Sequence, residues 1–310
     1  MRNQITHITK YALLMLFIFF LGGLFAGEGK KILVLNSNAS VEKYRVAQEA
    51  FTEAIVHPVI EIDLAEEKYK KTPEVEDLLY DEYPDLVYCI GTKAYVLANK
   101  FISERDIVFS SIINWRRLPV AKKTYGVSNE LHPEMQLAIY RYIFPGITKI
   151  GVLYSPDINR QWLDSMVEAG KGMGVKIVGN TVSNAKYTIE ALEELLPEVD
   201  ALWLISDPTV ISNKTVIMQI FKACDRQKKP VLSYHEAFTE YGAALIVSVD
   251  NPTVGRQAAD LTSEIVLNRP VDEKVQLPAG SHIILNRKKA DEFGLEYGKM
   301  AMSVVNQIVE

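Results

Sequence analysis

The chain has 310 residues, of which 48% are hydrophobic and 24% charged, so it has the composition of a folded protein and not of a collagenous or largely disordered one. Its 34 basic and 39 acidic residues give a formal charge of −5, which argues against the basic surface that nucleic-acid binding needs. Two cysteines and five histidines, with neither CxxC nor HExxH, offer no disulfide scaffold and no common zinc site. We therefore expect no metal, no other cofactor and no nucleic-acid partner.

The N-terminal segment is typical of an export signal. Arg2 and Lys10 precede an uncharged, mostly apolar run over residues 11–27. This pattern predicts a signal peptide over residues 1–27 and a periplasmic or other extracytoplasmic location. The alternative of an uncleaved anchor stays open, because the length of the run lies between that of a signal-peptide core and the roughly 20 residues that span a bilayer.

From residue 31 onward, short β-rich runs alternate with amphipathic stretches. Several runs are continuously apolar, as strands covered on both faces are. The stretches between them carry apolar residues three and four positions apart, for example Tyr44, Ala47, Phe51 and Ile55. This alternation predicts an α/β fold with doubly wound parallel sheets. The predicted strands cover residues 31–35, 59–64, 86–90, 107–112, 149–154, 175–182, 201–205, 230–234 and 243–249.

The length of the chain favours two lobes, which would enclose a cleft. A stretch with Pro and Lys but no apolar period, residues 118–124, predicts the main boundary between them.

Polar residues collect directly after the predicted strands. In an open parallel sheet, ligands bind outside the carboxyl ends of the strands, where loops lead into helix N-termini. Capping alone explains any one Ser, Asp or Asn at such a position, but charged residues among them favour a cleft for a small polar ligand. The candidate ligand-binding residues are Ser37, Gly91, Thr92, Lys93, Asn114, Ser155, Asn159, Asp207, His235 and Asp250.

Signatures of common enzymes are missing from the sequence. It contains no GxGxxG after the first strand, no GxxxxGK[ST] and no GxSxG. His235 beside Glu236 is a weak base and orienter pair, because neighbours on a loop rarely face each other. We therefore predict that the protein is not an enzyme and has no catalytic residues.

Buried roles are favoured for several chemically distinctive side chains. Trp162 and Trp203 are interpreted as core residues, while Trp115 is left open between core packing and ligand stacking. Cys89 and Cys224 occupy apolar positions in different predicted lobes, so no disulfide is expected between them.

Five segments stand out together: residues 85–100 (DLVYCIGTKAYVLANK), 122–130 (KKTYGVSNE), 149–159 (KIGVLYSPDIN), 247–266 (VSVDNPTVGRQAADLTSEIV) and 285–295 (LNRKKADEFGL). In their order and spacing they resemble the family of ABC transporter substrate-binding proteins, whose better-characterised members capture tryptophan and other aromatic amino acids. The resemblance covers essentially the whole chain after the signal. It implies the type I periplasmic binding protein fold, with two lobes joined by three crossing strands that close around a ligand by a hinge motion.

With three crossings, we expect lobe 1 to comprise residues 28–121 and about 251–278, and lobe 2 to comprise residues 122–250 and about 279–310. The resemblance also implies a monomer that captures a small polar ligand, an amino acid or related zwitterion or anion, and delivers it to an ABC permease for import. The alternative is a ligand-sensing input module for a membrane receptor or kinase, because one fold serves both uses.

The resemblance also implies roles for some candidate residues. Gly91 and Thr92 resemble a loop that contacts the ligand from lobe 1, and Ser155 to Asn159 resembles the facing loop of lobe 2. Asp207 and Asp250 stand where the family places acids that can meet an amino group. Three positions depart from the family pattern, namely Lys93, Asn114-Trp115 and Tyr234-His235, and they favour a ligand other than an ordinary amino acid. The charges of Lys93, Arg116 and Arg160 suit a more anionic ligand.

Overall fold

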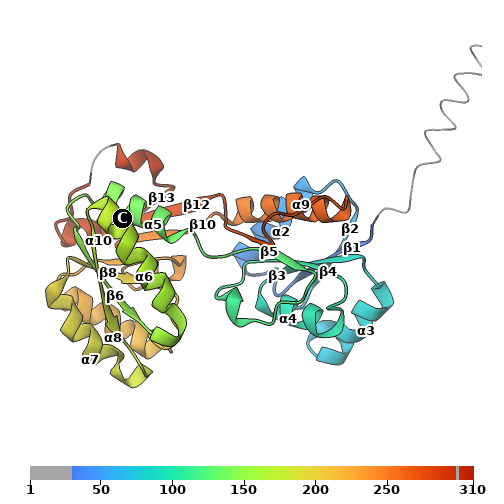
Figure 1. The fold of residues 1–310 in the computed structure, drawn as a ribbon, viewed down its shortest axis with the longest axis horizontal. Coiled ribbons are helices and arrows are strands. Elements are labelled where there is room, and N and C mark those ends of the chain that lie inside the picture. The colour runs from blue at the N-terminus through green and yellow to red at the C-terminus, as the bar shows by residue number, and fades with distance from the viewer. Residues whose placement is uncertain (1–29, 298–299) are drawn as a thin grey trace, which may run out of the picture.

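The computed structural model describes residues 30–297 and 300–310, so the predicted signal peptide lies outside the described residues. The chain forms two α/β lobes that lie side by side, each built on its own sheet (Figure 1). Within the described part of the chain, no helix is both long and apolar enough to cross a membrane.

Lobe 1 contains a six-stranded sheet in the order β11-β5-β4-β3-β1-β2, in which every strand pair is parallel. All residues of β1 and β3 are buried, because helices cover both faces of the sheet. The strands are β1 (Ile32–Asn36), β2 (Val59–Asp63), β3 (Leu86–Ile90), β4 (Asp106–Ser110), β5 (Thr124–Val127) and β11 (Val275–Gln276).

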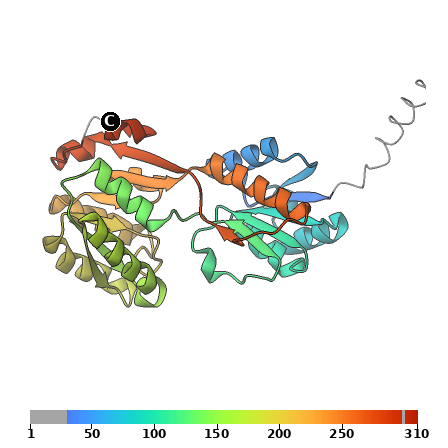
Figure 2. The ribbon, with the colours of Figure 1, turned by 45° about the horizontal axis from the view of Figure 1, so that its top comes forward.

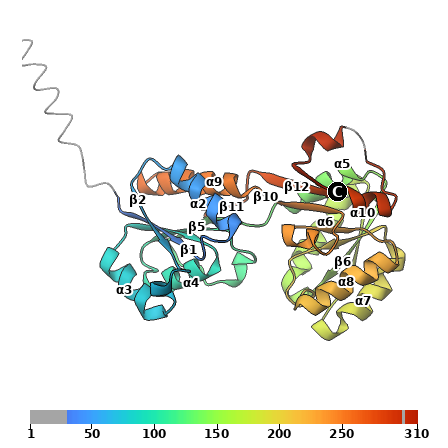
Figure 3. The same ribbon diagram turned by 180° about the vertical axis from the view of Figure 1, so that it is seen from behind.

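Two helix pairs cover this sheet. The helices α3 (Thr72–Glu82) and α4 (Thr92–Phe101) pack on one face, and α2 (Glu42–Ala54) and α9 (Asn251–Val266) pack on the other. In Figures 1 and 3 α2 and α9 lie side by side although some two hundred residues separate them. Their close approach needs Gly255, because a Cβ there would lie 2.1 Å from the carbonyl oxygen of Ala47.

Lobe 2 contains a seven-stranded sheet in the order β13-β12-β10-β9-β8-β6-β7. Its strand pairs are parallel except β10 with β12, which run antiparallel. The strands are β6 (Lys149–Tyr154), β7 (Lys176–Thr181), β8 (Ala201–Leu204), β9 (Val231–Ser233), β10 (Leu245–Val249), β12 (Ser281–Asn286) and β13 (Gln307–Val309).

Helices again cover both faces of the lobe 2 sheet (Figure 3). The pair α5 (Pro133–Ile143) and α6 (Pro156–Met173) packs on one face, and α7 (Thr188–Leu195) and α8 (Lys214–Arg226) pack on the other. The short α10 (Arg287–Glu292) follows β12. The α/β class and the two doubly wound lobes predicted from the sequence are therefore confirmed.

Three chain segments connect the lobes, and Figure 2 shows them passing from one to the other. They lie between β5 and α5, between β10 and α9, and between β11 and β12. The first connection begins later than the predicted boundary after residue 121. Because Thr124–Val127 pairs with β4, lobe 1 extends to residue 127. The strand at residues 124–127 was not predicted because it has no long apolar run. Its pairing with neighbouring strands makes it a strand.

One apolar cluster continues through the region of these connections. It joins Phe51 and Val254 of lobe 1 to Tyr140 and Trp203 of lobe 2, with Leu131 of the first connection buried between them. The lobes are therefore packed together on the side of the connections, while their opposite sides lie apart (Figure 1).

Candidate functional site

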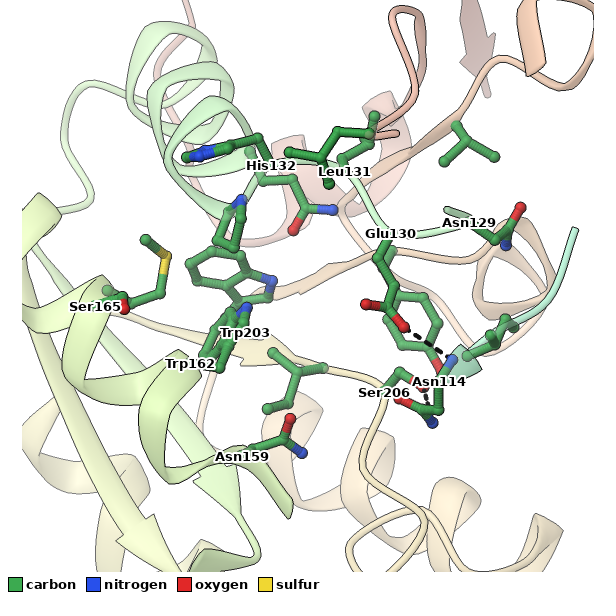
Figure 4. A pocket seen from close by; sticks show the side chains of 18 of the residues that line it. Asn114, Asn129, Glu130, Leu131, His132, Asn159, Trp162, Ser165, Trp203 and Ser206 are labelled. Carbon is green, nitrogen blue, oxygen red and sulfur yellow. Dashed lines mark hydrogen bonds between the residues drawn. The ribbon is translucent and has the colours of Figure 1, made fainter. Parts of the chain in front are cut away.

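A cavity of about 470 Å³ lies at the junction of the lobes (Figure 4). Lobe 1 contributes the loop around the short helix η2 (Trp115–Arg117), and lobe 2 contributes α5, α6 and the ends of β8 and β10. The first connection runs along one wall. Residues that line the cavity include Asn114, Arg116, Arg117, Asn129, Glu130, His132, Glu134, Gln136, Asn159, Trp162, Ser165, Trp203, Ile205, Ser206, Tyr234, Val247 and Leu277.

Two tryptophans form the aromatic wall. Trp162 of α6 and Trp203 of β8 meet edge to face, with ring centroids 5.0 Å apart. Tyr140 of α5 packs on Trp203 at 5.1 Å and 90°. Trp203 is only 1% exposed and belongs to the core, as predicted, but both tryptophans also line the cavity. Their assignment to the core alone is thus corrected, because α6 and β8 end at the junction of the lobes.

Asn114 links the two lobes. It follows β4 in a left-handed conformation with φ of 56°, which Asn tolerates better than most residues. Its side-chain Nδ2 donates to Ser206 Oγ of lobe 2 at 3.0 Å, and its backbone N–H donates to Glu130 Oε1 at 2.8 Å (Figure 4). Asn114 is therefore a predicted site residue that the structure places on the cavity wall.

Glu130 supplies a carboxylate at the cavity that the sequence reasoning missed. Besides Asn114, its carboxylate accepts from Arg116 Nη1 at 2.7 Å. The arginine side chain is 62% exposed, so this ion pair is weak and can be exchanged for another charged group. The site thus offers a pair of opposite charges at this edge, and Arg117 and Glu134 add further charges to the lining.

Asn159, in the first turn of α6, also lines the cavity, and a buried carboxylate behind it fixes its side chain. Its Nδ2 donates to Asp207 Oδ2 at 2.8 Å, and the backbone N–H of Ser155 donates to the same oxygen at 2.7 Å. The other oxygen of Asp207 accepts from the backbone N–H groups of Thr209 and Val210.

Asp207 is therefore surrounded by four donors of the protein and is 0% exposed. It does not line the cavity, and neither does Ser155. This corrects the expectation that Asp207 meets a ligand amine: its charge is used to hold two loops and α6 together.

Asp250, the second acid expected to meet an amine, caps α9. Its side chain accepts from the backbone N–H of Thr253 at 3.0 Å and lies 3.8 Å from Arg256. It stands on the second connection and does not line the cavity. Its contacts are those of a helix cap, which was the alternative to ligand binding for each polar residue after a strand.

The lobe 1 candidates Ser37, Gly91, Thr92 and Lys93 do not line the cavity as it stands. Ser37 Oγ accepts from the backbone N–H of Ala94, and Gly91, at φ of 84°, leaves room for that contact because its Cβ would come within 2.7 Å of Ser37 Oγ. Lys93 Nζ donates to the carbonyl of Leu64 at 2.7 Å. Thr92 is exposed at the start of α4.

These loops nevertheless lie at the same edge as Asn114, because the carboxyl ends of β1, β3 and β4 share one edge of a parallel sheet. The edge also carries α2, whose Lys43 reaches lobe 2, where its Nζ lies 3.5 Å from His235 Nε2. Asn114 with Ser206 and Lys43 with His235 are thus two polar contacts between the facing edges of the lobes.

His235 lies at this contact without lining the cavity. Its Nδ1 accepts from the backbone N–H of Ala237 at 3.1 Å, which makes it the cap of the next short helix. Burial, with a smaller contribution from the positive charge of Lys43, lowers the pKa of His235 from 6.5 to about 4. Burial also lowers the pKa of Lys43, and the charge of Glu236 partly opposes that shift.

We expect the free energy of unfolding to fall as the pH drops from about 6.5 towards 4. Over this range the unfolded chain takes up a proton at His235 that the folded chain does not bind, so folding is favoured less as the solution becomes more acidic. Urea titrations at pH 7 and pH 5 should show that the loss of unfolding free energy between the two pH values is smaller by about 2 kcal/mol in His235→Gln than in wild type. His57→Gln serves as the control, and an equal pH response in wild type and His235→Gln would contradict the expectation.

Other distinctive residues lie away from the cavity. Trp115 packs against Phe109 inside lobe 1, with centroids 5.9 Å apart, which resolves the question left open for it in favour of packing. Cys89 and Cys224 are buried free thiols in different lobes, as expected. Burial raises the pKa of Cys224 to about 12 and raises that of Cys89 as well.

Two α/β lobes joined by three connections, with a cavity at their junction, are the architecture of a bilobed small-molecule binding protein. A family comparison agrees: residues 34–307 match the model of the ABC transporter substrate binding protein family. The chain belongs to this family. The curated proteins contain no match.

Solved structures share the fold at low sequence identity. A Clostridium difficile substrate-binding protein with adhesive properties, in its ligand-free, open form, superposes with a TM-score of 0.68 at 17% identity, covering 90% of this chain and 99% of that one. The ABC domain from Streptococcus pneumonia in complex with L-Trp gives 0.57 at 18%, covering 90% and 100%. A conserved domain protein from Vibrio cholerae gives 0.59 at 19%, covering 91% and 100%.

Proposed function

We propose that the protein is the extracytoplasmic substrate-binding component of an ABC importer, acting as a monomer that passes a small polar ligand to a membrane permease. The observation that carries the proposal is the cavity of about 470 Å³ with walls from both lobes and from the first connection. A cavity of this size lies within the usual range for small-molecule sites. Membership of the substrate-binding family supports the same role.

The lining favours an amino acid or a related zwitterion or anion. Trp162 and Trp203 offer an apolar wall, while Glu130 and Arg116 offer opposite charges that at present neutralise each other. A zwitterion can exchange partners with this exposed pair, its cation meeting Glu130 and its anion meeting Arg116. The amine-binding role expected of Asp207 and Asp250 thus passes to Glu130.

Ligand contacts to both lobes would drive closure. A ligand shifts the balance between open and closed states only by binding one state more tightly than the other. Asn114 and Arg116 come from lobe 1, and Asn159 and Trp162 come from lobe 2, so a ligand among them gains contacts as the lobes approach. Closure would also bring Ser37 and Thr92 towards the ligand, because they share an edge with Asn114.

The test is a thermal-shift screen of the purified protein against amino acids, purines, sugars and small organic acids. A ligand at 100 times its dissociation constant adds about 2.7 kcal/mol to the free energy of unfolding. We expect a rise of several degrees in the melting temperature with one class of zwitterion or anion, and its recovery unchanged after incubation. A flat response across the panel contradicts capture of a free small molecule.

Replacing Trp162 by Ala is expected to weaken binding of the best compound from this screen about tenfold. The half-buried indole provides much of the apolar wall, and losing such a contact costs on the order of 1–2 kcal/mol. Isothermal titration calorimetry measures the change. Tyr187→Ala, which removes an exposed aromatic residue of lobe 2 outside the cavity, is the matched control. Equal affinities for the two variants would show that the ligand does not bind against the wall formed by Trp162 and Trp203.

A further inference from the structure

Trp203 holds a hydrogen-bond donor that the protein leaves unused. Its indole Nε1 is buried and has no hydrogen-bond partner among the described residues. The side chain is 1% exposed, yet the ring lines the cavity, and in Figure 4 its nitrogen-bearing edge faces the space that the cavity residues surround. A buried donor without a partner loses its hydrogen bond to water and gains none in return, so native proteins rarely leave one.

Several polar groups of the site have partners among the described residues, while Asn129 Oδ1, which also lines the cavity, is a buried acceptor without one. Tyr140, which packs on the same ring, donates its hydroxyl to the carbonyl of Ser233 at 3.0 Å, and the carboxylate of Asp207 has four donors. Trp115 has an unpartnered Nε1 too, but it packs inside lobe 1 and does not line the cavity. Trp203 is therefore the buried unpartnered side-chain donor that a ligand in this cavity faces.

The ring is also held in place. Tyr140 and Trp162 contact it edge to face at 5.1 and 5.0 Å, so the N–H direction is set before any ligand arrives. Gln136, 8% exposed and also lining the cavity, makes its hydrogen bond with the carbonyl of Val247 at 3.5 Å, the upper limit for such a bond. Its amide can therefore adjust to a ligand beside the fixed indole.

We propose that Trp203 is a specificity-determining residue whose indole N–H selects ligands with a hydrogen-bond acceptor on the edge that enters the cavity. The inference rests on the proposed function and adds the chemistry of the buried part of the ligand. A compound that supplies the acceptor satisfies the buried donor, and one of the same shape without it leaves the donor unpaired. Such a site discriminates by the cost of the unpaired group, which we expect to be about tenfold in affinity.

Benzimidazole and indole are suitable probes, because they have the same size and ring shape but only benzimidazole has an acceptor nitrogen. Titrations followed by the indole N–H resonances of the three tryptophans report binding and the state of Trp203 together, with Trp203→Phe providing the assignment. In wild type we expect benzimidazole to bind five to ten times more tightly than indole and to move the Trp203 resonance downfield.

In Trp203→Phe the preference should disappear. Trp162→Phe, the matched control, should weaken both probes and keep their ratio. The ratio of the two probe affinities in wild type does not depend on a variant that folds. Equal binding of the probes, failure of benzimidazole to bind, or a preference that survives in Trp203→Phe overturns the inference. A positive thermal-shift screen beside any of these results leaves ligand capture standing and removes only the role of Trp203.

Discussion

Asp207→Ala is expected to lower the free energy of unfolding by about 3–5 kcal/mol. The substitution takes the acceptor from the backbone N–H groups of Ser155, Thr209 and Val210 and from the amide of Asn159. Ser155 and Val210 are buried, so water cannot replace the lost carboxylate at those groups. Urea unfolding measures the loss, and a destabilisation below 1 kcal/mol would contradict the structural role of Asp207.

Asp200→Ala is the matched control for this variant. Asp200 also accepts several donors, the backbone N–H groups of Thr148 and Lys149 and the hydroxyl of Thr148, but it is only half-buried, so water can replace it. We expect it to lose about 1 kcal/mol. Asp207→Asn should fall between wild type and Asp207→Ala, because an amide offers one acceptor oxygen where the carboxylate offers two.

Gly255→Ala is expected to destabilise lobe 1 by about 2–4 kcal/mol. The new Cβ would lie 2.1 Å from the carbonyl oxygen of Ala47 and 3.0 Å from its carbonyl carbon, and these backbone atoms cannot turn aside as a side chain can. The helices α2 and α9 must therefore move apart, which opens the packing on that face of the sheet. Urea unfolding of the variant gives the cost.

Gly172→Ala is the control for a glycine inside a helix. It lies in α6, and a Cβ there would meet no atom within 4 Å. Alanine is the better helix former by about 1 kcal/mol, so this variant should equal or exceed wild type in stability. If Gly255→Ala proves as stable as Gly172→Ala, the close crossing of α2 and α9 is not the reason for the glycine.

The apolar runs of the sequence predicted the central strands well, because a strand covered on both faces has few alternatives. Residues 86–90 and 149–154 form strands at the predicted positions. The strands β5 and β12 were missed for different reasons. The sequence TYGV of β5 has no long apolar run, and its place is fixed by β4 and β11. β12 runs antiparallel because it returns from lobe 1, which strand and helix alternation does not predict.

The candidate site was predicted less completely than the fold. The rule that ligands bind at strand ends found Asn114 and Asn159, and both line the cavity. It also selected Asp207, although its neighbour Ser206 is the one that faces the cavity. Adjacent loop residues point in different directions, and only the packing of the loop decides between them. Glu130 lies on a connection between the lobes, three residues after β5, and the rule did not select it because β5 itself was not predicted.

The order of elements along the chain has a consequence for biosynthesis. Lobe 1 takes α9 and β11 from residues 251–276, after the whole of β6 to β10. Until that segment leaves the ribosome, the face of the lobe 1 sheet beside α2 lacks its second helix, and β5 forms an open edge without β11. The N-terminal lobe therefore cannot complete its core until nearly nine-tenths of the chain has been made. This topology delays stable folding of the N-terminal lobe until late in translation.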